Sequence, residues 1–522
     1  MSSSTATGGE MKRTLTLTGI TMNAMSFIAP GAFLWTTFQL QAAQSAGGAS
    51  TAFDMWTGLF FSVILAMLTA YSYSELARIY PNAGTGSSYY FAEAALLDKE
   101  KAQHRRFARV SKITIGWISH LYYWIYPAIM VAFTATLFGY IYQVITGQTL
   151  SWLVLSIIAV VFALISGYIA FRGISGSTNT AIAINVIQLT SLFAFAVVAI
   201  IFRLSHPHAV GGYEMAHATG VIFPHSLMHV IYQSTIAILL LVGFESVTAL
   251  GAEAKNPDKD IKKGVILSLA IQGLVAYLFE YFAANYVVGG ATITAIGQHG
   301  AKLTGYAAAA TDSAPLGTMI KTIGNQMFGG IGQTLALLMA ATVLLALIGT
   351  TLACLNSGVR ITYSMARDKE MPSILGLLHG KFATPHGGIW VLTAATAAIA
   401  IYGVKNVDTL TQITLASNAG TFIVYGLTCL IAIVAFASRH DKHPIKHLAI
   451  PGLGFLMNFA EFVGIIYLAV MAGGATASDA YIAMGMVAVW VVVGIVWIAM
   501  NPQKRGVKLI QAPEALKTSE AS

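Results

Sequence analysis

Apolar runs of about 20 residues dominate the chain, and this is the length at which an α-helix crosses the hydrocarbon core of a bilayer. The runs recur from near the start to about residue 500 of the 522-residue sequence. Only 10% of the residues are charged and 56% are hydrophobic, whereas soluble domains carry roughly a quarter charged residues. The sequence therefore predicts an all-α integral membrane protein.

The runs give about twelve predicted transmembrane helices. Their bounds are 15–40, 55–78, 113–143, 151–170, 179–203, 228–252, 262–289, 330–364, 388–404, 409–437, 451–472 and 480–500. The first ten spans lie within residues 15–437, and the last two lie within residues 438–500.

The distribution of Lys and Arg predicts the orientation of the chain. No cleavable signal peptide is evident, because a polar start leads directly into the first span. With the N-terminus inside, the outward loops hold few of the 29 Lys and Arg residues, namely Arg203, Lys302, Lys321 and Lys405. Cytoplasmic loops retain most basic residues, so residues 1–14 and 501–522 are predicted as cytoplasmic tails of a multi-pass protein of the cell (inner) membrane. Basic loops beside anionic lipid account for the net charge of +8 without nucleic-acid binding.

Two spans carry residues that interrupt a helix. In the first, SFIAPGAFLW contains Pro30 and Gly31, and in the sixth, LVGFESVTALG places Gly243 two residues before Glu245. A broken helix in lipid is tolerated only where its free backbone groups are buried in protein or line a cavity, and carboxylates within the membrane are usually functional. The breaks lie five spans apart, as expected for inverted repeats whose first helices meet at a midplane site. A simple kink at Pro30 and a structural, hydrogen-bonded Glu245 are the alternatives.

Three motifs resemble the amino acid–polyamine–organocation superfamily. YSYSELARIYPNAGTGSSYYFAEA (71–94) resembles the end of its second span, GFESVTALGAEAKNPDKDIKKGV (243–265) its sixth span and following loop, and NSGVRITYSMARDKEMP (356–372) the end of its eighth span. The resemblance covers roughly residues 12–440. It implies a five-plus-five inverted-repeat core with broken helices 1 and 6, two further C-terminal helices, and alternating-access transport of amino acids, polyamines or related amines.

The chain departs from this family at the first break. Family members carry a Gly-Ser-Gly-type segment whose N–H groups receive the substrate carboxylate, whereas this chain has Ala29, Pro30 and Gly31. Proline has no N–H, which leaves Gly31, Ala32 and the positive end of the following half-helix as donors. In this respect the chain looks more like the putrescine-importer branch of the superfamily.

The resemblance also implies individual site residues. Tyr123, Glu245 and Tyr425 match positions at which some members close an inner gate by hydrogen bonds, and Cys354 falls near an outer-gate position. The predicted substrate site comprises Ser26, Ala29, Pro30, Gly31, Ala32, Tyr126, Met130, Gly243, Phe244, Glu245, Ser417 and Asn418. Plain packing is the alternative interpretation for the tyrosines and for the cysteine.

The coupling ion has two candidate sites. Some proton-coupled members place a lysine in the fifth span, and the best match here is Gln188, which does not titrate. Glu245 could instead exchange a proton, and this alternative is favoured. In the other, Thr350 and Thr351 would join carbonyls of the first span around a sodium ion. Exchange without a coupling ion also stays open.

The predicted function is secondary active transport of amino acids. Import of polyamines or other amines is the alternative, and a transporter-like membrane sensor is an alternative of another class. An enzyme is not expected, because the acidic residues within the spans do not cluster in sequence. No cofactor or metal is expected either, since Cys354 and Cys429 lie within spans without ligand-type spacing. The predicted partners are a small amino acid or amine and the lipid bilayer.

Overall fold

The structure is a computed structural model of the chain. It describes residues 15–28, 30–80, 87–97, 105–173, 178–206, 218–250, 254–290, 292–296 and 301–500. The predicted tails, 1–14 and 501–522, and the predicted site residue Ala29 lie outside the described residues.

Ten helices in the described part are long and apolar enough to cross a membrane, as expected for a multi-pass, all-α membrane protein. They cover Ala52–Ile79, Ala108–Thr146, Trp152–Phe171, Asn179–Ser205, Pro257–Val288, Gly332–Arg367, His386–Gly403, Val407–Phe436, Ile445–Met471 and Gly474–Met500. Each corresponds to one predicted span. The two remaining predicted spans, 15–40 and 228–252, are divided into shorter pieces, so helix length alone establishes ten spans and the total of twelve stays a prediction.

The first half of the chain forms helices with one short hairpin. Its elements are α1 (Leu17–Phe27), α2 (Pro30–Ala42), β1 (Ser45–Ala46), β2 (Ala49–Ser50), η1 (Ala52–Asp54), α3 (Met55–Ile79), α4 (Ser88–Leu97), α5 (Arg105–Thr146), α6 (Trp152–Phe171), α7 (Thr178–Ser205), α9 (Thr219–Ile222), α10 (Leu227–Ala237), η3 (Ile238–Leu240) and η4 (Phe244–Leu250).

The second half adds a hairpin between two long spans. Its elements are α11 (Pro257–Leu269), the π-helix η5 (Ala270–Tyr277), α12 (Leu278–Val288), β3 (Thr294–Ile296), β4 (Lys302–Thr304), α13 (Gly305–Thr311), α14 (Pro315–Met327), α15 (Gly332–Arg367), η7 (Ser373–Gly376), α16 (His386–Gly403), α17 (Val407–Phe436), the π-helix η8 (Ile445–Ala449), α18 (Ile450–Met471) and α19 (Gly474–Met500).

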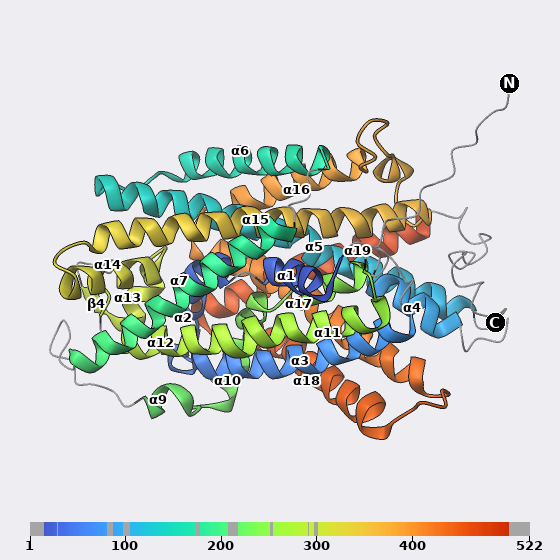
Figure 1. The fold of residues 1–522 in the computed structure, drawn as a ribbon, viewed down its shortest axis with the longest axis horizontal. Coiled ribbons are helices and arrows are strands. Elements are labelled where there is room, and N and C mark those ends of the chain that lie inside the picture. Colours follow the sequence, from blue (N-terminus) through green and yellow to red (C-terminus); the bar gives the residue numbers. More distant parts are fainter. Residues whose placement is uncertain are drawn as a thin grey trace.

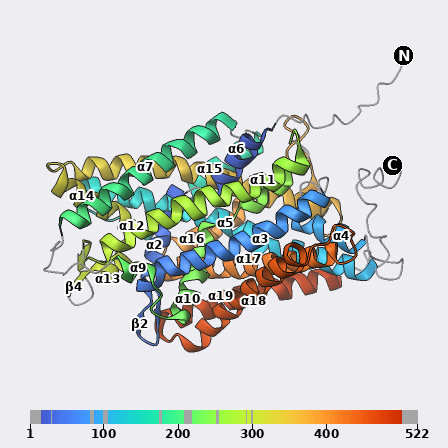
Figure 2. The same ribbon diagram turned by 60° about the horizontal axis from the view of Figure 1, so that its bottom comes forward.

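The long helices run along the longest axis of the molecule (Figure 1). α4 lies near one end of this bundle, which we call the α4 end, and β4, α13 and α14 lie near the other, which we call the hairpin end. β3 and β4 pair in antiparallel register, with Thr294 opposite Thr304. α6 packs against α16 at one edge of the bundle, whereas the two C-terminal helices, α18 and α19, pack against α17 at the far side (Figure 2).

Large apolar side chains cover the outer surface of the bundle. Leu153 on α6 is 63% exposed, and Tyr481 and Val489 on α19 are 74% and 64% exposed. A soluble monomer rarely shows apolar surface over whole helices, so these faces fit contact with lipid chains.

A buried ion cluster holds the α4 end together. The Lys112 ammonium on α5 lies 2.5 Å from Glu93 on α4 and 2.8 Å from Asp368, which follows α15. Tyr89 donates its hydroxyl proton to the same Asp368 at 3.0 Å. α4 was not predicted from the sequence, because this short helix has no membrane-length apolar run and its partners come from distant parts of the chain.

Candidate functional site

The break in the first span falls just before Pro30, slightly earlier than the predicted interruption at Pro30 and Gly31. Pro30 is the first residue of α2, a position that suits proline because its missing N–H would be unbonded there in any case. Carbonyls before the break accept hydrogen bonds from other helices. The Thr350 hydroxyl donates to the Ser26 carbonyl at 2.9 Å, and the Tyr277 hydroxyl donates to the Ile28 carbonyl at 2.8 Å.

The break in the sixth span lies where the sequence predicted it. α10 gives way to the 3₁₀ helix η3, a turn follows, and Gly243 leads into η4 with a φ of 122°. Such a backbone is essentially restricted to glycine. The buried Tyr126 hydroxyl on α5 bonds the Leu239 carbonyl at 3.0 Å and the Val242 carbonyl at 3.3 Å. One tyrosine therefore satisfies two carbonyls that an unbroken helix would bond internally.

The two breaks touch each other. A β-carbon added at Gly243 would lie 2.5 Å from Cβ of Phe27, the last residue of α1. The absence of a side chain at Gly243 is thus what allows the end of α1 to approach the turn in the sixth span.

We expect Gly243→Ala to destabilise the protein. The substitution would strain the backbone at a positive φ and push against Phe27, at a cost of about 1–3 kcal/mol, so the melting temperature of the purified protein in detergent should fall. Gly485→Ala is the matched control, because Gly485 lies within α19 and a β-carbon there would meet nothing within 4 Å. An unchanged melting temperature in Gly243→Ala would contradict the close approach of the breaks.

Glu245 lies at the centre of this contact and is fully buried. The Tyr425 hydroxyl on α17 donates to Glu245 Oε2 at 2.7 Å, and the Tyr123 hydroxyl on α5 donates to Oε1 at 3.3 Å. The Gly243 N–H also donates to Oε2, at 3.0 Å. The three predicted gate residues therefore meet, and this carboxyl is held by neutral donors from three segments rather than by a cation.

Aromatic rings pack between Glu245 and the α4 end of the bundle. Phe244 packs against Tyr425 with ring centroids 5.3 Å apart and against Tyr73 on α3 at 5.9 Å. The Tyr73 hydroxyl lies 2.5 Å from the Ser88 hydroxyl at the start of α4 and accepts from Thr428 at 3.3 Å. Buried rings and hydroxyls from α3, α4 and α17 thus separate the breaks from the α4 end.

The other predicted wall residues are also buried close to the sixth span. Met130 lies one helical turn after Tyr126 on α5 and is fully buried. Asn418 on α17 donates from Nδ2 to the Thr235 carbonyl of α10 at 2.7 Å. The Ser417 hydroxyl and Asn418 Oδ1 have no hydrogen-bond partner within the described residues, so the hydroxyl can donate to or accept from a small polar solute and the amide oxygen can accept from one.

Cys354 lies on α15 close to the level of the first break, and its place near an outer gate stays a prediction. α15 runs from the hairpin end toward the α4 end, and Cys354 follows Thr350, which marks the level of the first break. Its buried thiol is close enough to Tyr126 and Glu245 for electrostatic interaction. Thr351 is buried beside Thr350, and its hydroxyl has no partner within the described part. No group of three or more His, Cys, Asp or Glu side chains there is arranged to hold a metal ion.

Several residues that line the breaks were not predicted from the sequence. Tyr277, which bonds the first break, ends the π-helix η5, and π-helical turns occur frequently at functional sites. Asn185 on α7 donates to the Met22 carbonyl at 3.1 Å. The buried amide of Gln188, noted only as a missing lysine, would lie 3.5 Å from a β-carbon at Gly31 and has no partner among the described residues. The sequence signal for these residues is limited to the irregular spacing of polar side chains within their spans.

The sequence matches the model of the amino acid permease family over residues 19–505. This match includes both broken spans and all the helices described after them.

Curated relatives of the chain are transporters of several small molecules. It is 25% identical over 396 residues to the methylthioribose transporter of Bacillus subtilis (strain 168), covering 74% of each chain. It is 27% identical over 330 residues to the branched-chain amino acid permease BcaP of Lactococcus lactis, covering 60% of this chain and 61% of that protein. It is 24% identical over 508 residues to the low-affinity putrescine importer PlaP of Escherichia coli (strain K12), covering 94% of each.

Proposed function

Because this chain belongs to the amino acid permease family, we propose that it is a secondary active transporter that moves amino acids across the cell membrane by alternating access. The observation that carries the proposal is the contact between two broken spans beside a buried carboxyl. The start of α2 offers N–H groups and a positive dipole end to a carboxylate. Carbonyls and the Glu245 carboxyl offer acceptors to an ammonium group. In this proposal both termini lie in the cytoplasm of a cell with the protein in its inner membrane, so the α4 end faces inward.

Coupling to protons through Glu245 is part of the proposal. Glu245 is the carboxyl that contacts the sixth-span break, and its two tyrosine donors come from α5 and α17, helices that would separate from the sixth span if the inner side opened. The sodium alternative has weaker support, because the Thr350 hydroxyl already donates to the Ser26 carbonyl, a group that a sodium ion at this place would need as a ligand.

Import of amines such as putrescine is the second candidate function. Two observations favour it: Pro30 removes one carboxylate donor, and the similarity to a putrescine importer extends over 94% of both chains. A binding protein without flux, acting as a sensor, would share the same site.

Uptake into proteoliposomes separates these functions. We expect purified protein to accumulate radiolabelled amino acids from an equimolar mixture of the twenty common L-amino acids, and to accumulate them faster when the external pH is below the internal pH. Uptake of putrescine alone would favour the second candidate. Substrate-dependent thermal stabilisation without any uptake would favour the sensor.

A further inference from the structure

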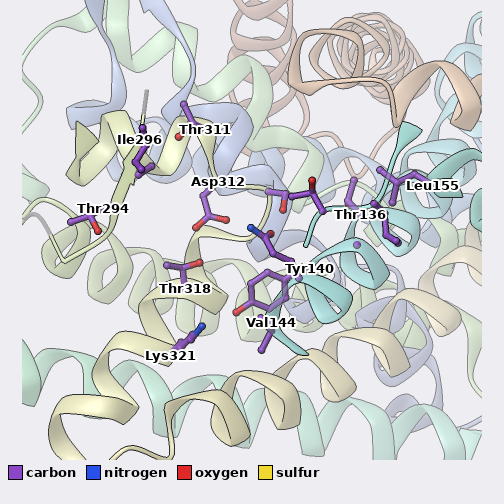
Figure 3. Close-up of a pocket in the computed structure, with 16 residues that line it drawn as sticks. Thr136, Tyr140, Val144, Leu155, Thr294, Ile296, Thr311, Asp312, Thr318 and Lys321 are labelled. Atoms are coloured by element: carbon purple, nitrogen blue, oxygen red, sulfur yellow. The ribbon is translucent and has the colours of Figure 1, made fainter. Parts of the chain in front are cut away.

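A cavity of about 640 Å³ opens at the hairpin end, apart from the site described above. Figure 3 shows its walls: Thr136 and Tyr140 come from α5, and Asp312, Thr318 and Lys321 come from the segment that leads into and forms α14. We call this cavity the vestibule. By the predicted orientation it faces the outside of the cell.

Two opposite charges line the vestibule without neutralising each other. Within the described residues, neither the Asp312 carboxylate nor the Lys321 ammonium forms an ion pair. Thr318 lies beside Asp312, and Lys321 follows Thr318 by about one helical turn of α14, so both charged side chains line the same wall of the cavity. A ligand that carries both charges would complement this wall.

The Asp312 carboxylate is held in place but incompletely solvated. Its Oδ1 accepts from the Ala314 N–H at 2.9 Å, and the Thr318 side chain lies beside it. Burial raises the pKa of the Asp312 carboxyl, although Thr318 and the Ala314 N–H act in the opposite direction. An ammonium group on a ligand would replace hydration that the carboxylate has lost.

The floor of the vestibule is connected to the first break. Tyr140 is 3% exposed, and its hydroxyl has no hydrogen-bond partner within the described residues. Its ring packs edge-on against Trp35 of α2, with centroids 5.6 Å apart, and a β-carbon at Gly317 would lie 2.5 Å from the Tyr140 hydroxyl. α2 is the half-helix that starts at the break, so a ligand at Tyr140 would touch a side chain that packs directly against this half-helix.

From these observations we propose that the vestibule is a first binding site for the zwitterionic head group of an α-amino acid, with Asp312 holding the ammonium group and Lys321 holding the carboxylate. This proposal rests on the proposed function. It narrows the substrate class to amino acids, because the Lys321 ammonium would repel a diamine. A solute captured here would be released toward the central site when Trp35 and Tyr140 separate.

The concentration dependence of uptake tests the vestibule. In proteoliposomes supplied with the radiolabelled mixture of twenty L-amino acids, Asp312→Asn and Lys321→Met should each raise the half-saturating concentration about threefold to tenfold, the loss expected for one charge-assisted contact. The maximal rate should stay close to that of the wild type, because neither residue lies at the breaks. A preserved maximal rate also shows that the variant is folded.

Lys302→Met is the matched control. Lys302 lies on β4 in the same outer region and does not line the vestibule, so this variant removes the same charge and should leave the half-saturating concentration unchanged. If both vestibule variants take up amino acids at the wild-type rate and with the wild-type half-saturating concentration, the vestibule is not a binding site for the substrate. The proposed transport function would be unaffected by that result. Uptake of putrescine but not of amino acids would overturn the proposed amino acid transport, and with it the assignment of Lys321.

Discussion

Replacing Glu245 with glutamine is expected to lower amino acid uptake about tenfold or more, the factor that corresponds to one lost charge-assisted interaction. Glutamine keeps the shape of the side chain, and the Tyr123 and Tyr425 hydroxyls can rotate to donate or accept. The fold should therefore persist. What disappears is the carboxyl among the contacts described at the sixth-span break, whereas a tyrosine hydroxyl keeps its proton near neutral pH, so the dependence of uptake on the pH gradient should disappear with it.

Glu461→Gln is the matched control for this variant. Glu461 is another fully buried acid, on α18, and it accepts a hydrogen bond from Ser234, a bond that a glutamine oxygen can also accept. We expect this control to keep both its uptake rate and its pH dependence. Initial rates at several external pH values, measured on equal amounts of reconstituted protein, give the comparison. Wild-type uptake with an unchanged pH profile in Glu245→Gln would remove this carboxyl from the mechanism.

The parts of the molecule that could be predicted from sequence are those set by local patterns. Membrane helices follow from continuous apolar runs, and ten helices match predicted spans because the bilayer fixes their length. The breaks follow from residues whose backbone chemistry acts on their immediate neighbours: Pro30 cannot donate an N–H, and Gly243 adopts a φ that other residues avoid. The meeting of Tyr123 and Tyr425 at Glu245 was accessible only through the resemblance to a family.

The parts that escaped prediction depend on contacts between distant segments. Tyr277 bonds the first break across 249 positions of sequence, and a tyrosine among many in apolar spans gives no sign of such a role. Of the two vestibule charges, Lys321 was noted only as a basic residue of an outward loop, and Asp312 was not singled out, since both acquire a common cavity only where α14 approaches Tyr140 of α5. Cys354 follows Thr350 on α15 and interacts with Glu245, a contact between distant segments, and its place near an outer gate stays a prediction.

The double substitution Pro30→Ala/Gly31→Ala is expected to abolish substrate binding. In a continuous helix the N–H of position 30 would donate to the Ser26 carbonyl and that of position 32 to the Ile28 carbonyl. Pro30 prevents the first of these bonds, and Thr350 and Tyr277 hold the two carbonyls instead. Alanine restores the missing N–H and has the highest helix propensity. We therefore expect α1 and α2 to join into one helix, whose N–H groups would compete with Thr350 and Tyr277 for the two carbonyls.

If α1 and α2 joined into one helix, the backbone groups that the proposed site offers to a solute would bond to each other. The free N–H groups at the start of α2 would bond to carbonyls of α1, which removes the donors for a substrate carboxylate. Steric damage is not the cause, because a β-carbon at Gly31 would lie 3.5 Å from the nearest side chain, an ordinary contact. Pro257→Ala is the control, since Pro257 also begins a helix but the residues directly before it, 254–256, are not helical. Calorimetric titration with the transported amino acid should show at least about tenfold weaker binding in the double variant and unchanged binding in the control. Retained affinity in a monodisperse double variant would mean that Pro30 only bends the span and that the solute binds elsewhere.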